Sequence, residues 1–115
     1  MLKRRIEVME ASNVINGDTA EFMLKVIGIL ENEHVCTSSE QTVMFITHLA
    51  LAFQRITAGK NAESMSEESW KEVTECPEFG RAEELCEKIL SAGCVSFHEN
   101  ERKYLTLHIC NMLAA

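Results

Sequence analysis

Residues 43–56, VMFITHLALAFQRI, form the longest apolar stretch of the chain and contain neither glycine nor proline. The segment Ser38-Ser39-Glu40-Gln41 before it is typical of a capping box, in which Ser38 accepts a backbone N–H bond while Gln41 reaches back. Gly59 follows the stretch at the position where a glycine often ends a helix. The apolar side chains lie almost all around such a helix, so we predict the central helix of the fold here, ending near Ala58.

Two further helices are predicted on either side of this one. Residues 18–33 carry an apolar stripe at helical spacing, and Asp18 or Thr19 is the expected cap after a turn at Asn16-Gly17. Residues 64–73 begin with another segment that resembles a capping box, and they predict a short helix.

Two more helices are predicted toward the C-terminus. Pro77 suits the first turn of a helix that Gly93 ends. Ser96 and Glu99 form a further capping box ahead of a last helix, which runs nearly to the end of the chain.

The first residues leave more than one structure open. Leu2, Ile6 and Met9 have a short helical spacing, but residues 1–12 fit a strand or an arm equally well. We therefore expect a leader or arm over residues 1–17 and one helical domain over residues 18–115. The predicted fold class is all-α, a single bundle of five or six helices with short connections.

Composition narrows the possible partners and the compartment. The chain has 115 residues, the usual size of one domain, and its 46% hydrophobic and 25% charged residues are typical of a globular protein. Its net charge of −7 argues against nucleic acid and anionic membranes as partners. Polar residues interrupt the apolar stretch and no secretory core follows the first residues, so we expect a soluble cytoplasmic protein.

The cysteines and one Glu–His pair are the candidates for a metal or redox site. The cysteine count of five is odd and no CxxC motif occurs, which argues against a disulfide framework, structural zinc and thioredoxin-like chemistry. Cys86 and Cys110 lie in apolar helical patterns and are predicted core residues. Glu31-x-x-His34 matches half of a di-iron signature without a second copy, so a metal- or ligand-binding bundle stays a hypothesis and no metal ligand is assigned.

Two histidines have a charged residue on the same predicted helix face. Arg55 follows His48 by seven residues, and Glu101 precedes His108 by seven residues. Seven steps along an α-helix return to within about 20° of the same direction, roughly 10 Å along the axis. Each helix therefore presents a histidine and a charged group together, with Tyr104 between them on the last helix. A histidine on an apolar helix is also commonly a hydrogen-bonded core or boundary residue, and that interpretation stays open.

Three segments carry a resemblance to a known family. Residues 45–56, FITHLALAFQRI, hold a histidine, a leucine after it and an arginine seven residues on. Residues 77–82, PEFGRA, hold a proline, an aromatic residue and an alanine. Residues 100–109, NERKYLTLHI, place an acidic residue, an aromatic residue and a leucine before a histidine. This ordered set, spread over residues 18–114, resembles the regulation domain of the bacterial phosphoenolpyruvate:sugar phosphotransferase system (PTS), which occurs in antiterminators and activators.

The resemblance implies a five-helix, often dimeric domain whose two histidines accept phosphoryl groups. His48 and His108 match these phosphoacceptors, Arg55 matches the arginine near the first, and Glu101 matches the acidic residue of the second motif. The implied donors are the phosphocarrier protein HPr or a PTS permease B component. A stand-alone domain of this kind would act as an acceptor that signals through protein contacts in transcriptional regulation, without a cofactor or enzymatic activity of its own.

Two positions differ from the family pattern. Many members have an aspartate directly before the first histidine, where this chain has Thr47. Another acidic residue often precedes the matched glutamate, where this chain has Asn100. These differences support a second hypothesis, a module of the same fold that is not phosphorylated and acts only through dimerisation or binding to a partner.

Overall fold

The computed structural model describes residues 2–35, 39–60, 64–93 and 97–114, and within these ranges every regular element is a helix. The helices are α1 Leu2–Ala11, α2 Gly17–Asn32, α3 Glu40–Thr57, α4 Glu67–Thr74, α5 Phe79–Ser91 and α6 Glu99–Ala114. The predicted all-α fold is confirmed, and the described residues contain six helices, within the predicted five or six. None of these helices is long and apolar enough to cross a membrane.

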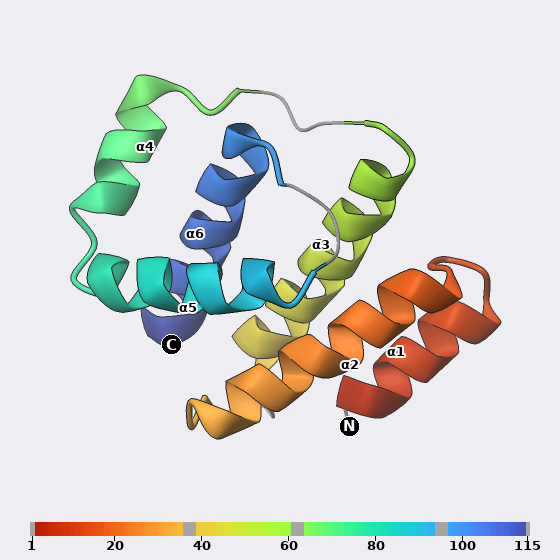
Figure 1. Ribbon diagram of the computed structural model, residues 1–115. Coiled ribbons are helices and arrows are strands. Elements are labelled where there is room, and N and C mark those ends of the chain that lie inside the picture. Colours follow the sequence, from red (N-terminus) through yellow and green to blue (C-terminus); the bar gives the residue numbers. More distant parts are fainter. Residues whose placement is uncertain (1, 36–38, 61–63, 94–96, 115) are drawn as a thin grey trace.

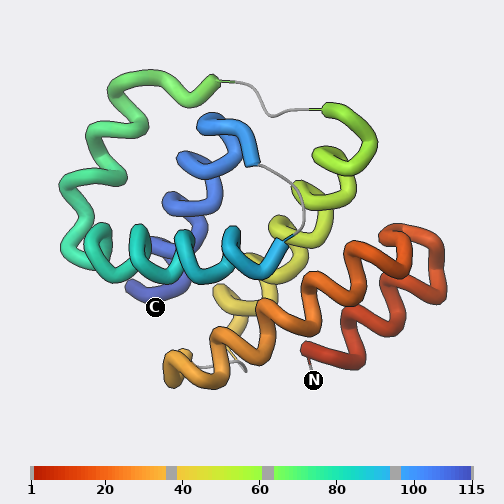
Figure 2. Tube along the Cα trace, in the orientation of Figure 1, coloured from red at the N-terminus to blue at the C-terminus, as the bar shows by residue number. Residues whose placement is uncertain are grey.

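The helices pack around two central elements, α3 and α6 (Figure 1). Helix α3 lies between α2 and α6, and α6 also packs against α4 and α5. The Cα trace shows α1 lying beside α2 at one end of the molecule, away from α4 and α5 (Figure 2). The predicted central position of α3 is therefore observed, but α6 shares it.

One aromatic cluster joins α2, α3 and the segment before α6. The rings of Phe22 and Phe53 are stacked with centroids 4.3 Å apart, and Phe97 lies 6.2 Å from each. Gly93 lies close beside this cluster, because a Cβ atom there would lie 3.2 Å from the ring of Phe22 and the ring would have to shift slightly. Burial of this much aromatic surface fixes how α2 and α3 meet.

Helix α3 is less buried than its sequence predicts. Phe45, Ile46 and Leu49 are almost fully buried, whereas Met44 and Leu51 are exposed. The prediction that α3 is covered almost all round is therefore wrong on one face. The main described neighbours of α3 are α2 and α6, and between them His48, Met44 and Leu51 on α3 remain exposed.

The N-cap of α2 lies two or three residues earlier than predicted. Asn16, not Asp18 or Thr19, is its N-cap, and the Asn16 side-chain oxygen accepts the backbone N–H of Thr19 at 2.9 Å. Asparagine is among the best N-cap residues, and Gly17 becomes the first helical residue instead of part of a separate turn.

Serines cap the next two helices. Ser39 accepts the backbone N–H of Thr42 at the start of α3, and Ser66 does the same at the start of α4. The capping roles predicted for Ser38 and Ser96 lie outside the described residues. Pro77 lies in the turn before α5 rather than in its first turn, since the helix begins at Phe79.

Helices α2 and α3 both end in a Schellman motif. Gly59 has φ of +79°, and Lys60 N–H donates to the carbonyl of Arg55, as predicted for a C′ glycine. His34 takes the same place after α2 with φ of +58°, and Val35 N–H donates to the carbonyl of Leu30. His34 therefore lies in a left-handed conformation that glycine adopts more easily.

Residues 2–11 form a helix that packs into the core, rather than the strand or arm that their sequence also allows. Leu2 and Ile6 are buried, and α1 packs along α2. Cys86 and Cys110 are buried as well, so their prediction as core residues is confirmed.

Candidate functional site

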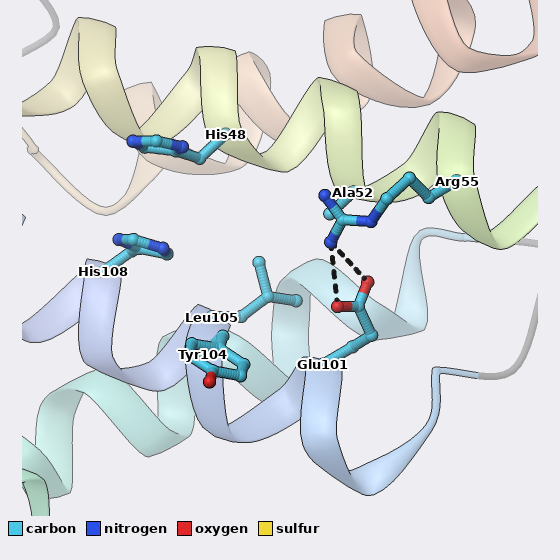
Figure 3. Close-up of a pocket in the computed structure, with 7 residues that line it drawn as sticks. All are labelled: His48, Ala52, Arg55, Glu101, Tyr104, Leu105 and His108. Carbon is cyan, nitrogen blue, oxygen red and sulfur yellow. Dashed lines mark hydrogen bonds and ion pairs between the residues drawn. The ribbon is translucent and has the colours of Figure 1, made fainter. Parts of the chain in front are cut away.

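Two imidazole rings lie face to face between α3 and α6 (Figure 3). The ring centroids of His48 and His108 are 4.6 Å apart, and the ring planes are inclined by only 8°. His48 is exposed, whereas His108 is half-buried. The structure therefore brings the two predicted phosphoacceptor positions together in one site.

The seven-residue spacing on each helix explains this arrangement. Arg55 lies two turns after His48 on α3, and Glu101 lies two turns before His108 on α6. The two helices run in opposite directions where they face each other, so His48 meets His108 and Arg55 meets Glu101 (Figure 3).

The second pair is an ion pair with one buried partner. Arg55 Nη2 donates to both carboxylate oxygens of Glu101, at 3.0 Å to Oε1 and 3.3 Å to Oε2. The side chain of Glu101 is 2% exposed and that of Arg55 is 47% exposed. Because an unpaired buried carboxylate is costly, Arg55 is the group that allows Glu101 to lie at this position.

A cavity of about 280 Å³ is bounded by both pairs. Its lining residues are His48, Ala52, Arg55, Glu101, Tyr104, Leu105 and His108. Ala52 and Leu105 were not singled out from the sequence. The available signal was helical spacing, because Ala52 follows His48 by four residues and its small side chain leaves space between the histidine and the arginine.

The electrostatic environment keeps His108 neutral. Burial lowers the pKa of His108 below its ordinary value of 6.5, and the nearby charge of His48 when protonated lowers that pKa further. A neutral imidazole has a ring nitrogen with a free lone pair, which is the form that acts as a nucleophile or a metal ligand.

The residue before His48 connects α3 to α1. Thr47 Oγ1 accepts a hydrogen bond from Arg5 Nε at 3.0 Å and donates to the carbonyl of Val43, also at 3.0 Å. The position where the family pattern has an aspartate is therefore occupied by a hydroxyl that accepts a hydrogen bond from the Arg5 guanidinium.

At the start of α6, the backbone N–H of Asn100 donates to Nδ1 of His98 at 3.1 Å. The sequence did not suggest this capping role for His98.

Other candidate sites receive less support from the geometry. In the part of the chain that the structure describes, no three histidine, cysteine, aspartate or glutamate side chains converge as metal ligands, Glu31 and His34 included. Burial and the neighbouring groups of Cys76 and Glu78 raise the pKa of the Cys110 thiol to about 12. A thiol with such a pKa is protonated at neutral pH and is a poor nucleophile.

Comparisons with known proteins identify the family of the chain. The family model of the PRD domain matches residues 22–111, which includes both histidines and the Arg55–Glu101 pair. The chain is also 25% identical over 115 residues to the uncharacterized protein YhfY of Escherichia coli (strain K12), covering 99% of this chain and 96% of that relative. No solved structure matches the chain. The match to most of its length shows that the chain belongs to the PRD domain family.

Proposed function

We propose that this chain is a regulatory domain of the bacterial sugar phosphotransferase system that accepts a phosphoryl group on His48 or His108. The donor in this proposal is HPr or a PTS permease B component. The observation that carries the proposal is the stacked histidine pair at 4.6 Å, open to solvent at His48 and next to an arginine.

The chemistry suits these residues. The lone pair of a neutral imidazole nitrogen attacks phosphorus as the donor's N–P or S–P bond breaks, so the phosphoryl group changes carrier and no water is consumed. The guanidinium of Arg55 lines the same cavity and supplies N–H donors for the charge on the phosphoryl oxygens. The chain is the acceptor in this reaction and not its catalyst.

The modification would change the contact between α3 and α6. A phosphohistidine carries nearly two negative charges at neutral pH, and this charge is added directly beside the second imidazole ring of the stack. The new charge also competes with Glu101 for Arg55. We propose that this local rearrangement alters the surface seen by a protein partner, either a second copy of this chain or a separate regulator.

The test is the intact mass of the purified chain after incubation with phosphoenolpyruvate, enzyme I and HPr, with and without permease B components. We expect a gain of one or two phosphoryl groups that mild acid removes, and loss of that gain in a His48→Ala/His108→Ala variant. A gain that persists in the double variant would contradict the assignment to these histidines.

A second candidate is a module of the same fold that is not phosphorylated and acts only through protein contacts. The observation that favours it is Thr47, whose hydroxyl is engaged by Arg5 and cannot act as the carboxylate of the family pattern. Failure of every donor to modify the chain, while a known acceptor is modified in the same reaction, would favour this second function.

A further inference from the structure

We infer that a protein phosphoryl donor docks on an apolar surface around His48 formed by Met44 and Leu51 of α3 and Val8 of α1. We call this surface the donor face. The inference rests on the proposed function and extends it to residues outside the cavity lining that recognise the donor.

The α3 part of the donor face follows from exposure and helical spacing. Met44 precedes His48 by four residues and Leu51 follows it by three, so both side chains share the face of α3 that carries the histidine. Met44 is 53% exposed and Leu51 is 39% exposed. Large apolar side chains on both sides of an exposed histidine cannot be explained by the core of this chain.

Helix α1 adds to the same surface. The hydrogen bond from Arg5 to Thr47 places the exposed side of α1 next to the residue that precedes His48. Val8 lies one turn after Arg5, just as Leu51 lies one turn after Thr47. The two helices run in the same direction there, since Asn16 N–H donates to the Gln54 side chain 3.1 Å away. Val8 is exposed and lies one turn from Arg5 on α1, so we assign it to the edge of the donor face.

Most of the exposed large apolar side chains among the described residues belong to the donor face. Among the described residues, the exposed large apolar side chains are Val8, Val14, Leu24, Met44 and Leu51. Three of these five belong to the donor face, while Val14 lies in the loop after α1 and Leu24 lies on α2. Exposed apolar side chains gathered around a reactive group indicate a site of protein contact.

Transfer to His48 specifies the occupant. The donor must bring phosphorus to bonding distance of a ring that lies between Met44 and Leu51, so a donor of protein size covers both residues. The covering apolar surface excludes water from the transferring group. The chain has a net charge of −7, but Arg5 contacts the residue before His48 and Arg55 lines the cavity with His48. These two guanidinium groups complement the anionic phosphoryl group that the donor carries. Transfer needs only a transient complex, for which a small interface is sufficient.

The experiment compares two phosphoryl donors of different size. Wild-type chain and the variants Met44→Glu, Leu51→Glu and Val8→Glu are incubated with phosphorylated HPr or a phosphorylated permease B component, and separately with phosphoramidate, a small donor that needs no docking surface. The rate of phosphohistidine formation at His48 is followed by mass spectrometry. Leu24→Glu, on α2 and 42% exposed, is the matched control, and circular dichroism reports whether each variant is folded.

We expect Met44→Glu and Leu51→Glu to lower the second-order rate with the protein donor at least tenfold, and Val8→Glu to lower it less. With phosphoramidate all variants should match wild type within about twofold, and Leu24→Glu should match wild type with both donors. Unchanged rates with the protein donor in the donor-face variants would overturn the inference while leaving the proposed function intact.

Two other outcomes are also decisive. If the variants dissociate a dimer but accept phosphoryl groups at the wild-type rate, the surface belongs to a second copy of this chain and the inference is wrong. If wild-type His48 reacts with phosphoramidate but with none of the protein donors, the proposed function fails, and the donor face fails with it.

Discussion

The carboxylate of Glu101 on α6, 2% exposed, lies 3.0 Å from the guanidinium of Arg55 on α3. This pair and the histidine stack are two attachments between the same two helices, about two turns apart. The ion pair therefore has a structural role as well as a position beside the site.

Loss of the Arg55 guanidinium should leave a buried carboxylate without its cation. We expect Arg55→Ala to lower the free energy of unfolding by about 1–3 kcal/mol, less than for a fully buried pair because Arg55 is half exposed to solvent. Arg55→Ala/Glu101→Gln should recover part of the loss, since an uncharged amide needs no cation. Urea denaturation measures both effects, and Arg81→Ala on α5 is the control. Equal stability of Arg55→Ala and wild type would show that the pair does not stabilise the fold.

The lowered pKa of His108 predicts a dependence of stability on pH. The folded chain binds a proton at His108 less readily than the unfolded chain, whose histidine titrates near 6.5. The contribution of His108 is therefore complete above pH 6.5 and is lost as the pH falls from 6.5 toward the lower folded-state pKa. The free energy of unfolding, measured by denaturation between pH 5 and 8, should change more with pH for wild type than for His108→Gln. His34→Asn serves as the control, and an identical pH slope for His108→Gln and wild type would contradict the prediction.

His34 lies in the left-handed region at the end of α2, so glycine should be better there. We expect His34→Gly to raise the free energy of unfolding by up to about 1 kcal/mol, because a side chain with φ of +58° is strained. His34→Val should have the opposite effect, since a β-branched residue tolerates this conformation poorly. Thermal denaturation ranks the three proteins, and a His34→Gly variant less stable than wild type would show that the imidazole makes a favourable contact.

Burial raises the pKa of the Cys86 thiol, and the pKa of the Cys110 thiol is raised to about 12. Only a small fraction of either thiol is ionised at pH 8, so both should react slowly with iodoacetamide in the folded chain. Peptide mapping by mass spectrometry after timed labelling gives the rate at each site. Labelling in urea provides the reference, and rates for Cys86 or Cys110 that match this reference would contradict the described burial.

Helix α1 should contribute to stability although the family match begins at residue 22. Ile6 is almost completely buried, so Ile6→Ala should lower the free energy of unfolding by about 2–4 kcal/mol. Val8→Ala, on the exposed side of the same helix, should change it by less than about 0.5 kcal/mol. Similar stabilities for the two variants would mean that α1 is a loosely attached arm.

The sequence predicted the composition of the site better than its assembly. Helical spacing alone put His48 with Arg55 and Glu101 with His108, because seven residues return to one face of any α-helix. It could not predict that α3 and α6 pack in opposite directions, since that depends on contacts such as Phe53 with Phe97 that are far apart in sequence. The family resemblance supplied the expectation that both histidines act in one system.

The other differences between the sequence predictions and the structure have local causes. Asn16 and the two downstream residues Asp18 and Thr19 are all acceptable caps, and the choice among them is made by the hydrogen bonds of Asn16 and Thr19 to the Gln54 side chain. Leu2 and Ile6 are too few to define a helix by spacing alone, so the packing of α1 on α2 decides the structure of these residues. The exposed face of α3 could not be recognised from the sequence, because methionine and leucine are residue types that usually lie in the core.

The parallel stack of His48 and His108 makes this chain its own spectroscopic reporter. Each aromatic ring lies in the magnetic field of the ring current of the other, so the ring protons of both histidines should resonate away from their usual proton NMR frequencies while the rings are 4.6 Å apart. Any event that separates the two rings, such as the binding of a partner between α3 and α6, would remove this ring-current contribution from their frequencies. The opening of the α3–α6 contact can therefore be followed in the unlabelled protein, in real time and without an added probe.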